Sequence, residues 1–164
     1  LPSLAYVTDS GSNETDYFRK VLRKMKHPLT DKPFQWTRVA DFYHVSERIW
    51  AMAHAIFGAM KKQQAAAWAR RMLKELKKPC GASRVLHSAA SLFHRRKLSK
   101  GRKDDYHKAY RYIQKRLRYL QYYDYRQQHL PIGSGMTEAA CKTIVTQRLK
   151  LSGMAWSHAP CGNN

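Results

Sequence analysis

The spacing of the apolar residues changes near residue 46, and that change limits the folds that the chain can adopt. Leu4–Thr8 and Phe34–Ala40 are short, β-prone segments, and an aspartate directly follows each of them. Between them, residues 14–25 have helical spacing, and residues 27–33 break the helix. The order strand, helix, strand is typical of a βαβ unit, so we predict an α/β start.

From Ser46 onward, apolar residues recur every three or four positions, as in amphipathic helices. Ser46 is the expected N-cap of the first helix. The last helix is expected to begin at Asp104 or Asp105 and to run as one long helix towards Gln128. The chain is therefore predicted to be mostly α by residue count. The four expected apolar faces are Ile49, Trp50, Ala53, Phe57 and Met60; Ala65, Ala69, Met72 and Leu76; Val85, Ala89, Leu92 and Phe93; and Tyr106, Tyr110, Ile113, Leu117 and Leu120.

A glycine-rich segment follows the helices. His129–Gly135 contains one proline and two glycines, which predicts a loop. Thr137 is a suitable N-cap for a helix that begins at Glu138. A carboxylate is therefore expected in the first turn of a helix, directly after this loop.

Positive charge is the strongest feature of the composition. The chain has 31 Lys and Arg against 11 Asp and Glu, which gives a formal net charge of +20. Such a surface attracts polyanions, so DNA is the expected partner; a basic domain that binds no nucleic acid is the alternative. The basic residues expected to contact DNA are Arg70, Arg71, Lys74, Arg95, Arg96, Lys97, Lys142, Arg148 and Lys150.

The lengths of the apolar runs and the spacing of the cysteines predict the cellular location of the protein. No apolar run approaches the roughly 18 to 20 residues that cross a bilayer, so no membrane association is expected. The three cysteines are far apart and form no CxxC pair. Free thiols of this kind fit a reducing cytoplasm, which is the expected location.

Three acidic residues occupy special backbone positions: Asp9, Asp41 and Glu138. Asp9 and Asp41 end the two predicted strands, where ligand sites of open α/β sheets lie. Carboxylates that converge there can bind Mg²⁺ or Mn²⁺, and two such ions can activate a water or a 3′-hydroxyl against a phosphodiester. The alternative is structural, because an Asp at a strand end often caps a turn or a helix, and the helix dipole favours a Glu in a first turn.

Three segments carry a resemblance to a known family. They are Asp41–Glu47, Ile132–Lys142 with its Gly-Ser-Gly-Met-Thr-Glu sequence, and Gln147–Ser157. The segments resemble insertion-sequence transposases of the ISKra type, which belong to the DDE class with an RNase H-like fold. The resemblance runs from about Tyr6 to Ser157, and its most specific part is the Gly-Ser-Gly block with Glu138.

The resemblance implies a function and a set of site residues. It implies metal-dependent DNA cleavage and strand transfer with two Mg²⁺ or Mn²⁺ ions, by a homo-oligomer that acts on transposon ends and target DNA in the bacterial nucleoid, with no small-molecule substrate. It also implies that Asp9 and Glu138 are the second and third carboxylates of the triad and bind the metal. Asp41 and His44 resemble a C/D-x-x-H signature of such families, whose role is either catalytic or structural.

Another assignment makes Asp9 the first carboxylate and Asp41 the second. In RNase H-like folds the first Asp lies on a strand that continues into antiparallel hairpins, whereas Asp9 leads directly into a helix, so we favour Asp9 as the second. The upstream strand that would supply the first Asp is absent, and the tail after Ser157 lacks a further helical segment. The chain is therefore expected to be a partial copy that is inactive alone.

The expected organisation has four parts. Residues 1–45 are the C-terminal portion of an RNase H-like sheet, 46–128 a large helical insertion, 129–157 the loop and the catalytic helix, and 158–164 a tail. The alternative function is a non-catalytic basic module, derived from a truncated or domesticated transposase, that binds DNA or mediates assembly while its acidic residues only cap.

Overall fold

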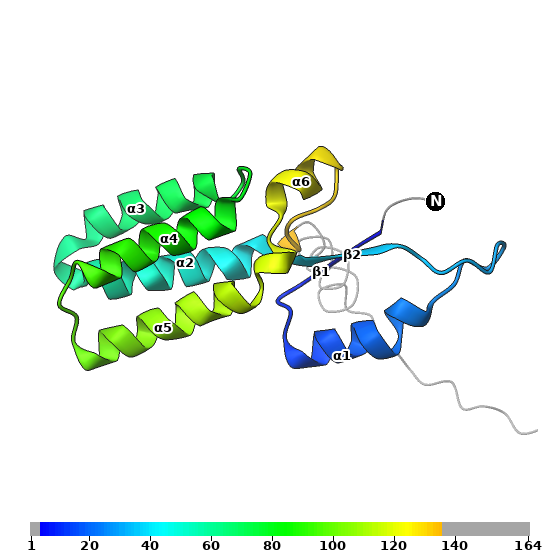
Figure 1. Cartoon of the computed structure of the whole chain (residues 1–164), viewed down its shortest axis with the longest axis horizontal. Coiled ribbons are helices and arrows are strands. Elements are labelled where there is room, and N and C mark those ends of the chain that lie inside the picture. The colour runs from blue at the N-terminus through cyan, green and yellow to red at the C-terminus, as the bar shows by residue number, and fades with distance from the viewer. Residues whose placement is uncertain (1–3, 136–164) are drawn as a thin grey trace, which may run out of the picture. The chain divides into compact units, whose positions relative to one another are not determined.

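A small parallel sheet begins the fold, and the computed structural model describes residues 4–135 (Figure 1). Strand β1 (Leu4–Thr8) pairs in parallel with β2 (Trp36–Ala40), so that Thr8 lies opposite Ala40. Helix α1 (Ser12–Lys20) and the 3₁₀ turn η1 (Leu22–Lys24) connect the two strands. The predicted order of strand, helix and strand is confirmed.

The ends of these elements differ from the predicted ones. The helix predicted over residues 14–25 ends at Lys20, and the chain then tightens into η1, which buries Leu22. The second strand begins at Trp36 rather than Phe34, because the backbone N–H of Phe34 donates to the Met25 carbonyl, 3.2 Å away, and not to β1.

The rest of the described chain is helical, as the sequence predicts. Helix α2 packs between α3 and α5, and α4 closes the group against α3 and α5 (Figure 1). No helix in residues 4–135 is long and apolar enough to cross a membrane. The helical elements are α2 (Phe42–Phe57), η2 (Ala59–Lys61), α3 (Lys62–Glu75), α4 (Gly81–His94), α5 (Lys100–Lys115), η3 (Leu117–Tyr119) and α6 (Tyr122–Gln127).

The first helix of this group begins earlier than predicted. Asp41, not Ser46, is its N-cap, and Ser46 lies inside α2, where its hydroxyl donates to the Phe42 carbonyl at 2.6 Å. The helix stops before Gly58, whose φ of 72° requires a residue without a side chain. Met60, predicted on the buried face, is therefore outside the helix and 97% exposed.

The long helix predicted from Asp104 to Gln128 is broken. Helix α5 begins at Lys100, four residues before Asp104, and it ends at Lys115. The chain then turns through η3 into α6, which brings two tyrosine hydroxyls to β2. Tyr122 donates to the Ala40 carbonyl at 2.7 Å, and Tyr125 donates to the Arg38 carbonyl at 3.3 Å.

One hydrophobic core joins the sheet to the helices. Val39 and Ala40 of β2 are buried against residues of α2 and α6. The predicted faces are largely confirmed, since most of their members are buried. The buried members are Ile49, Ala53, Ala65, Ala69, Met72, Leu76, Val85, Ala89, Tyr106, Ile113 and Leu120.

Candidate functional site at the strand ends

The parallel register brings both strand-end aspartates to one edge of the sheet. Asp9 follows Thr8 and Asp41 follows Ala40, and these two strand residues are paired. The backbone N–H of Asp41 donates to the Thr8 carbonyl at 2.7 Å, which continues the ladder to the last residue. The shared edge of the two aspartates, which the sequence predicts, is therefore present.

Asp41 is a buried carboxylate with both oxygens engaged. Its side chain is 1% exposed, and Oδ1 accepts hydrogen bonds from the backbone N–H groups of Tyr43 at 2.7 Å and His44 at 3.4 Å. Oδ2 accepts from the Ser134 N–H at 2.7 Å. Burial favours the neutral acid, but these hydrogen bonds outweigh it and hold the pKa of Asp41 below its ordinary value. Asp41 therefore caps α2 and holds the loop that contains Ser134.

That loop lies along the start of α2. The Phe42 N–H donates to the Ile132 carbonyl at 2.9 Å, one residue after the Asp41 cap. Gly133 lies close to the Tyr43 ring, since a Cβ there would be 3.2 Å from it and the exposed ring would have to shift by a few tenths of an ångström. The glycine-rich segment is thus fixed at the strand ends up to Ser134.

The Asp9 carboxylate is less constrained. It is half-buried, and Oδ1 accepts a hydrogen bond from the Gly11 N–H at 3.0 Å. Within residues 4–135 no Lys, Arg or His forms an ion pair with it. The Glu14 carboxylate lies on the same turn, because a Cβ at Gly11 would meet Glu14 Oε2 at 2.5 Å and Asp9 Oδ1 at 3.3 Å. A side chain at Gly11 would therefore displace one of these carboxylates.

Tyr112 of α5 and Arg116, which directly follows this helix, hold the backbone of the turn that carries Asp9. The Tyr112 hydroxyl donates to the Asp9 carbonyl at 2.9 Å, and Arg116 Nε donates to the same oxygen at 3.0 Å. Arg116 Nη2 donates to the Ser10 carbonyl at 2.9 Å, where Ser10 adopts a φ of 56° that is unusual for a non-glycine residue. The helical segment therefore fixes the conformation that carries Asp9.

The pKa of the Tyr112 hydroxyl depends on its burial and on the charges around it. Burial raises the pKa of the Tyr112 hydroxyl, and the positive charges of Arg116 and Arg48 act in the opposite direction. The carboxylates of Asp9 and Asp41 raise that pKa further. Both carboxylates are therefore close enough to interact electrostatically with this hydroxyl. The sequence did not single out Tyr112 or Arg116, although their four-residue spacing places them on one helical face.

His44 does not form a hydrogen bond with Asp41. Its Nδ1 lies 3.7 Å from Asp41 Oδ1, which is beyond hydrogen-bonding distance, and this nitrogen has no other partner in the described part of the chain. The side chain is 43% exposed. The predicted choice between a catalytic and a structural role for His44 therefore stays open.

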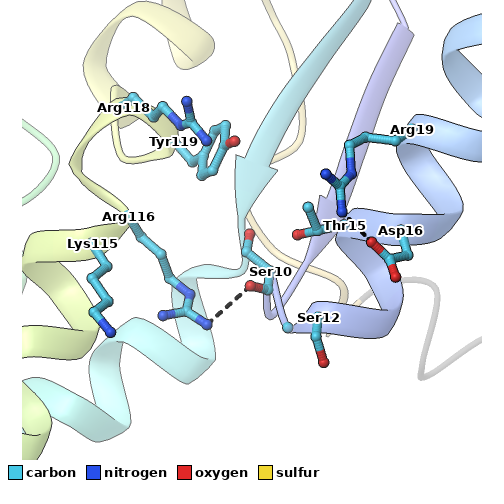
Figure 2. Close-up of a pocket in the computed structure, with 10 residues that line it drawn as sticks. Ser10, Ser12, Thr15, Asp16, Arg19, Lys115, Arg116, Arg118 and Tyr119 are labelled. Atoms are coloured by element: carbon cyan, nitrogen blue, oxygen red, sulfur yellow. Dashed lines mark hydrogen bonds and ion pairs between the residues drawn. The ribbon is translucent and has the colours of Figure 1, made fainter.

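A cavity of about 390 Å³ lies beside the Asp9 turn, between α1 and the junction of α5 with η3 (Figure 2). Four basic side chains line it, together with Asp16, which pairs with one of them. Arg38 supports its wall by donating to the Thr15 hydroxyl and to the Tyr119 hydroxyl, both at 2.9 Å. The basic lining residues are Arg19, Lys115, Arg116 and Arg118.

The predicted DNA-contacting residues that the structure describes lie on α3 and on the connection between α4 and α5. Those of α3 are exposed, and those of the α4–α5 connection are exposed except Arg96, whose guanidinium lies 4.5 Å from the centre of the Phe57 ring. The exposed ones are Arg70, Arg71, Lys74, Arg95 and Lys97.

The remaining predicted site residues lie outside the described residues: Glu138, Lys142, Arg148 and Lys150. Within residues 4–135, no three His, Cys, Asp or Glu side chains gather closely enough to hold a metal ion. No family model, curated protein or solved structure matches this chain.

Proposed function

We propose that this chain is part of an RNase H-like DNA transposase of the DDE class, which cleaves DNA and transfers its strands with divalent metal ions. The observation that carries this proposal is the attachment of the glycine-rich loop to the strand ends. The backbone N–H of Ser134 binds Asp41, beside the strand that ends at Asp9. Two distant parts of the sequence, each followed by a candidate carboxylate, therefore meet at one edge of the sheet.

The order of the elements supports the same proposal. Two parallel strands joined by a helix are followed by a helical group, which returns to the strand ends before the candidate Glu helix begins. This order matches what the resemblance implies for the second carboxylate, the helical insertion and the third carboxylate. The topology also favours Asp9 as the second, because Asp9 leads into α1.

The oxygen donors suit Mg²⁺ or Mn²⁺. Both oxygens of Asp41 accept backbone hydrogen bonds, whereas within residues 4–135 a single hydrogen bond engages the Asp9 carboxylate, which leaves lone pairs for a hard cation. Glu138, the other candidate ligand, follows Ser134 by four residues in the sequence. Asp9 and Glu138 would hold the metal, which would activate a water or a 3′-hydroxyl against a phosphodiester. DNA is the proposed substrate, given the net charge of +20.

Metal binding by the protein that carries this chain tests the proposal. Asp9→Asn keeps the side-chain oxygen that accepts from Gly11 but removes the negative charge. We expect calorimetry to show at least tenfold weaker Mn²⁺ binding for Asp9→Asn and for Glu138→Gln. Asp105→Asn, an exposed carboxylate of α5, is the matched control and should bind Mn²⁺ like the unaltered protein. Unchanged Mn²⁺ affinity in Asp9→Asn would overturn the metal assignment.

A second candidate is a non-catalytic basic module that binds DNA. The observation in its favour is that both strand-end carboxylates already have structural roles, Asp9 in its turn with Gly11 and Asp41 as the N-cap of α2. This candidate predicts DNA binding that does not depend on divalent metal. DNA cleavage that requires Mn²⁺ and is lost in Asp9→Asn would exclude it.

A further inference from the structure

Three cavities adjoin one another along α5. The first is the cavity beside the Asp9 turn, and the second, of about 530 Å³, shares Lys115 and Arg116 with it. The third, of about 330 Å³, shares Lys108 with the second and reaches Arg48 on α2. Because neighbouring cavities share lining residues, they follow one another along the helix, and this row of three cavities is here called the α5 track.

The α5 track is strongly basic. Eight Lys or Arg side chains line its cavities against three Asp. Lys108, Arg111 and Lys115 are exposed, and none of them forms an ion pair within the described residues. Their spacing of three and four residues places them on one face of α5, over about 10 Å of helix. Charges of this kind are free to bind an external anion.

The chemistry of the α5 track favours phosphates over bases. Tyr112 is an aromatic residue in the middle cavity, but the Arg116 guanidinium lies 3.8 Å from its ring centre, and its hydroxyl is bonded to Asp9. A base could not stack on a ring face that is already covered. About 10 Å of duplex DNA carries roughly six phosphate charges, which suits a row of cations.

We propose that the phosphate backbone of DNA lies along the α5 track, over Lys108, Arg111 and Lys115, and reaches the Asp9 turn at its end. That the partner is DNA rests on the proposed function. The path of its backbone rests on the positions of the three cavities and of the basic residues that line them. Arg116 lines the end of the track and also holds the Asp9 carbonyl, so a strand bound there passes beside the candidate catalytic carboxylate. The exposed basic residues of α3 line none of these three cavities.

Two triple variants with equal charge change separate the surfaces. One replaces Lys108, Arg111 and Lys115 by Gln, and the other does the same to the basic residues of α3. Their affinities for a fluorescent 20-base-pair duplex are compared by anisotropy over a range of salt concentrations. Thermal unfolding shows whether both variants are folded. We expect both to be folded, because all six replaced side chains are exposed.

We expect the α5 variant to bind the duplex at least tenfold more weakly and the α3 variant less than about threefold more weakly. Log affinity should also fall less steeply with log salt in the α5 variant, its slope being less negative by about 2 to 3, as expected for the loss of three phosphate contacts. Equal losses, a larger loss in the α3 variant, or no duplex binding by the unaltered protein would overturn the track. Displacement of the duplex by a few millimolar inorganic phosphate would also overturn it, because the site would then hold a small anion.

A third variant separates this inference from the proposed function. If the α5 variant loses DNA binding while Asp9→Asn keeps full Mn²⁺ affinity, the track stands and the metal assignment fails. If Asp9→Asn loses Mn²⁺ binding while the α5 variant binds DNA normally, the metal assignment stands and the track fails.

Discussion

Asp9 and Asp41 end neighbouring parallel strands, yet their surroundings differ. Asp41 is buried and accepts hydrogen bonds from three backbone N–H groups, one of which lies 93 residues away in the sequence. Asp9 is half-buried, and its carboxylate accepts one hydrogen bond from the described part of the chain, from the Gly11 N–H. The Asp9 turn is instead held through its carbonyl oxygens, by Tyr112 and Arg116. One strand end is fixed through its carboxylate and the other through its backbone.

This difference shows how a fold can leave a carboxylate available. A carboxylate whose oxygens all accept backbone hydrogen bonds stabilises the structure but has little capacity left for a metal ion or a substrate. When the backbone of a turn is fixed by other side chains, its carboxylate can keep a defined position and still have free lone pairs. Position at a strand end does not by itself distinguish these two cases.

The largest expected difference is in stability. Asp41→Ala removes a helix N-cap and the attachment of the Ser134 loop, and should lower the free energy of unfolding by about 3 kcal/mol. Asp9→Ala removes one hydrogen bond at a half-exposed turn and should cost about 1 kcal/mol or less. Urea unfolding of both variants measures the difference. Equal losses would show that the two carboxylates are structurally equivalent.

A smaller effect is expected from the side chains that hold the Asp9 turn. Arg116→Met keeps much of the apolar stem but leaves the Asp9 and Ser10 carbonyls with fewer donors, and should cost about 2 kcal/mol. Lys115→Gln, at the neighbouring exposed position, is the control and should change stability by less than about 0.5 kcal/mol. If Arg116→Met were as stable as the control, the Asp9 turn would not depend on Arg116.

The β2 side can be tested independently of its carboxylate. Tyr122→Phe removes a buried hydroxyl that donates to the Ala40 carbonyl, and should cost about 1 to 2 kcal/mol. Tyr123 is 39% exposed, so Tyr123→Phe should be nearly neutral. Thermal unfolding of the pair gives the comparison, and a neutral Tyr122→Phe would mean that α6 does not stabilise the end of β2.

The smallest expected effect is on the pH dependence of stability. The folded pKa of Asp41 lies below its ordinary value of 3.8, so its ionised form stabilises the fold. This contribution is complete above the unfolded-state pKa and is lost as the pH falls through the lower folded pKa. Between pH 6 and pH 2, Asp41→Asn should therefore lose less stability than the unaltered protein. Parallel urea midpoints for the two proteins would contradict this explanation.

The sequence predicts the strands and most buried helical residues because both depend on local patterns. It cannot choose between Asp41 and Ser46 as the N-cap of α2, since both residue types cap well. That choice is made by Ser134, which is distant in sequence and supplies a further hydrogen bond to Asp41. The break after α5 has a similar origin, because Arg116 bonds to Asp9 and Ser10, more than 100 residues earlier.

In the candidate site, too, the features set by local sequence are predictable and those set by distant contacts are not. The shared edge of Asp9 and Asp41 is predictable from parallel strands of similar length. The roles of Tyr112 and Arg116 are not, because the surrounding sequence is rich in tyrosine and arginine and no local signal marks these two. The α5 track is equally hard to predict, since α3 has exposed basic residues of its own and their charge alone does not distinguish the two helices.

The contacts of α6 with β2 have a consequence for association between molecules. The exposed edge of a strand can pair with a strand of another chain and begin aggregation. Tyr122 and Tyr125 bond the Ala40 and Arg38 carbonyls, which point away from β1. At Arg38 and Ala40 these hydroxyls therefore occupy the acceptors that an incoming strand would need, which disfavours pairing of a further strand at this end of β2.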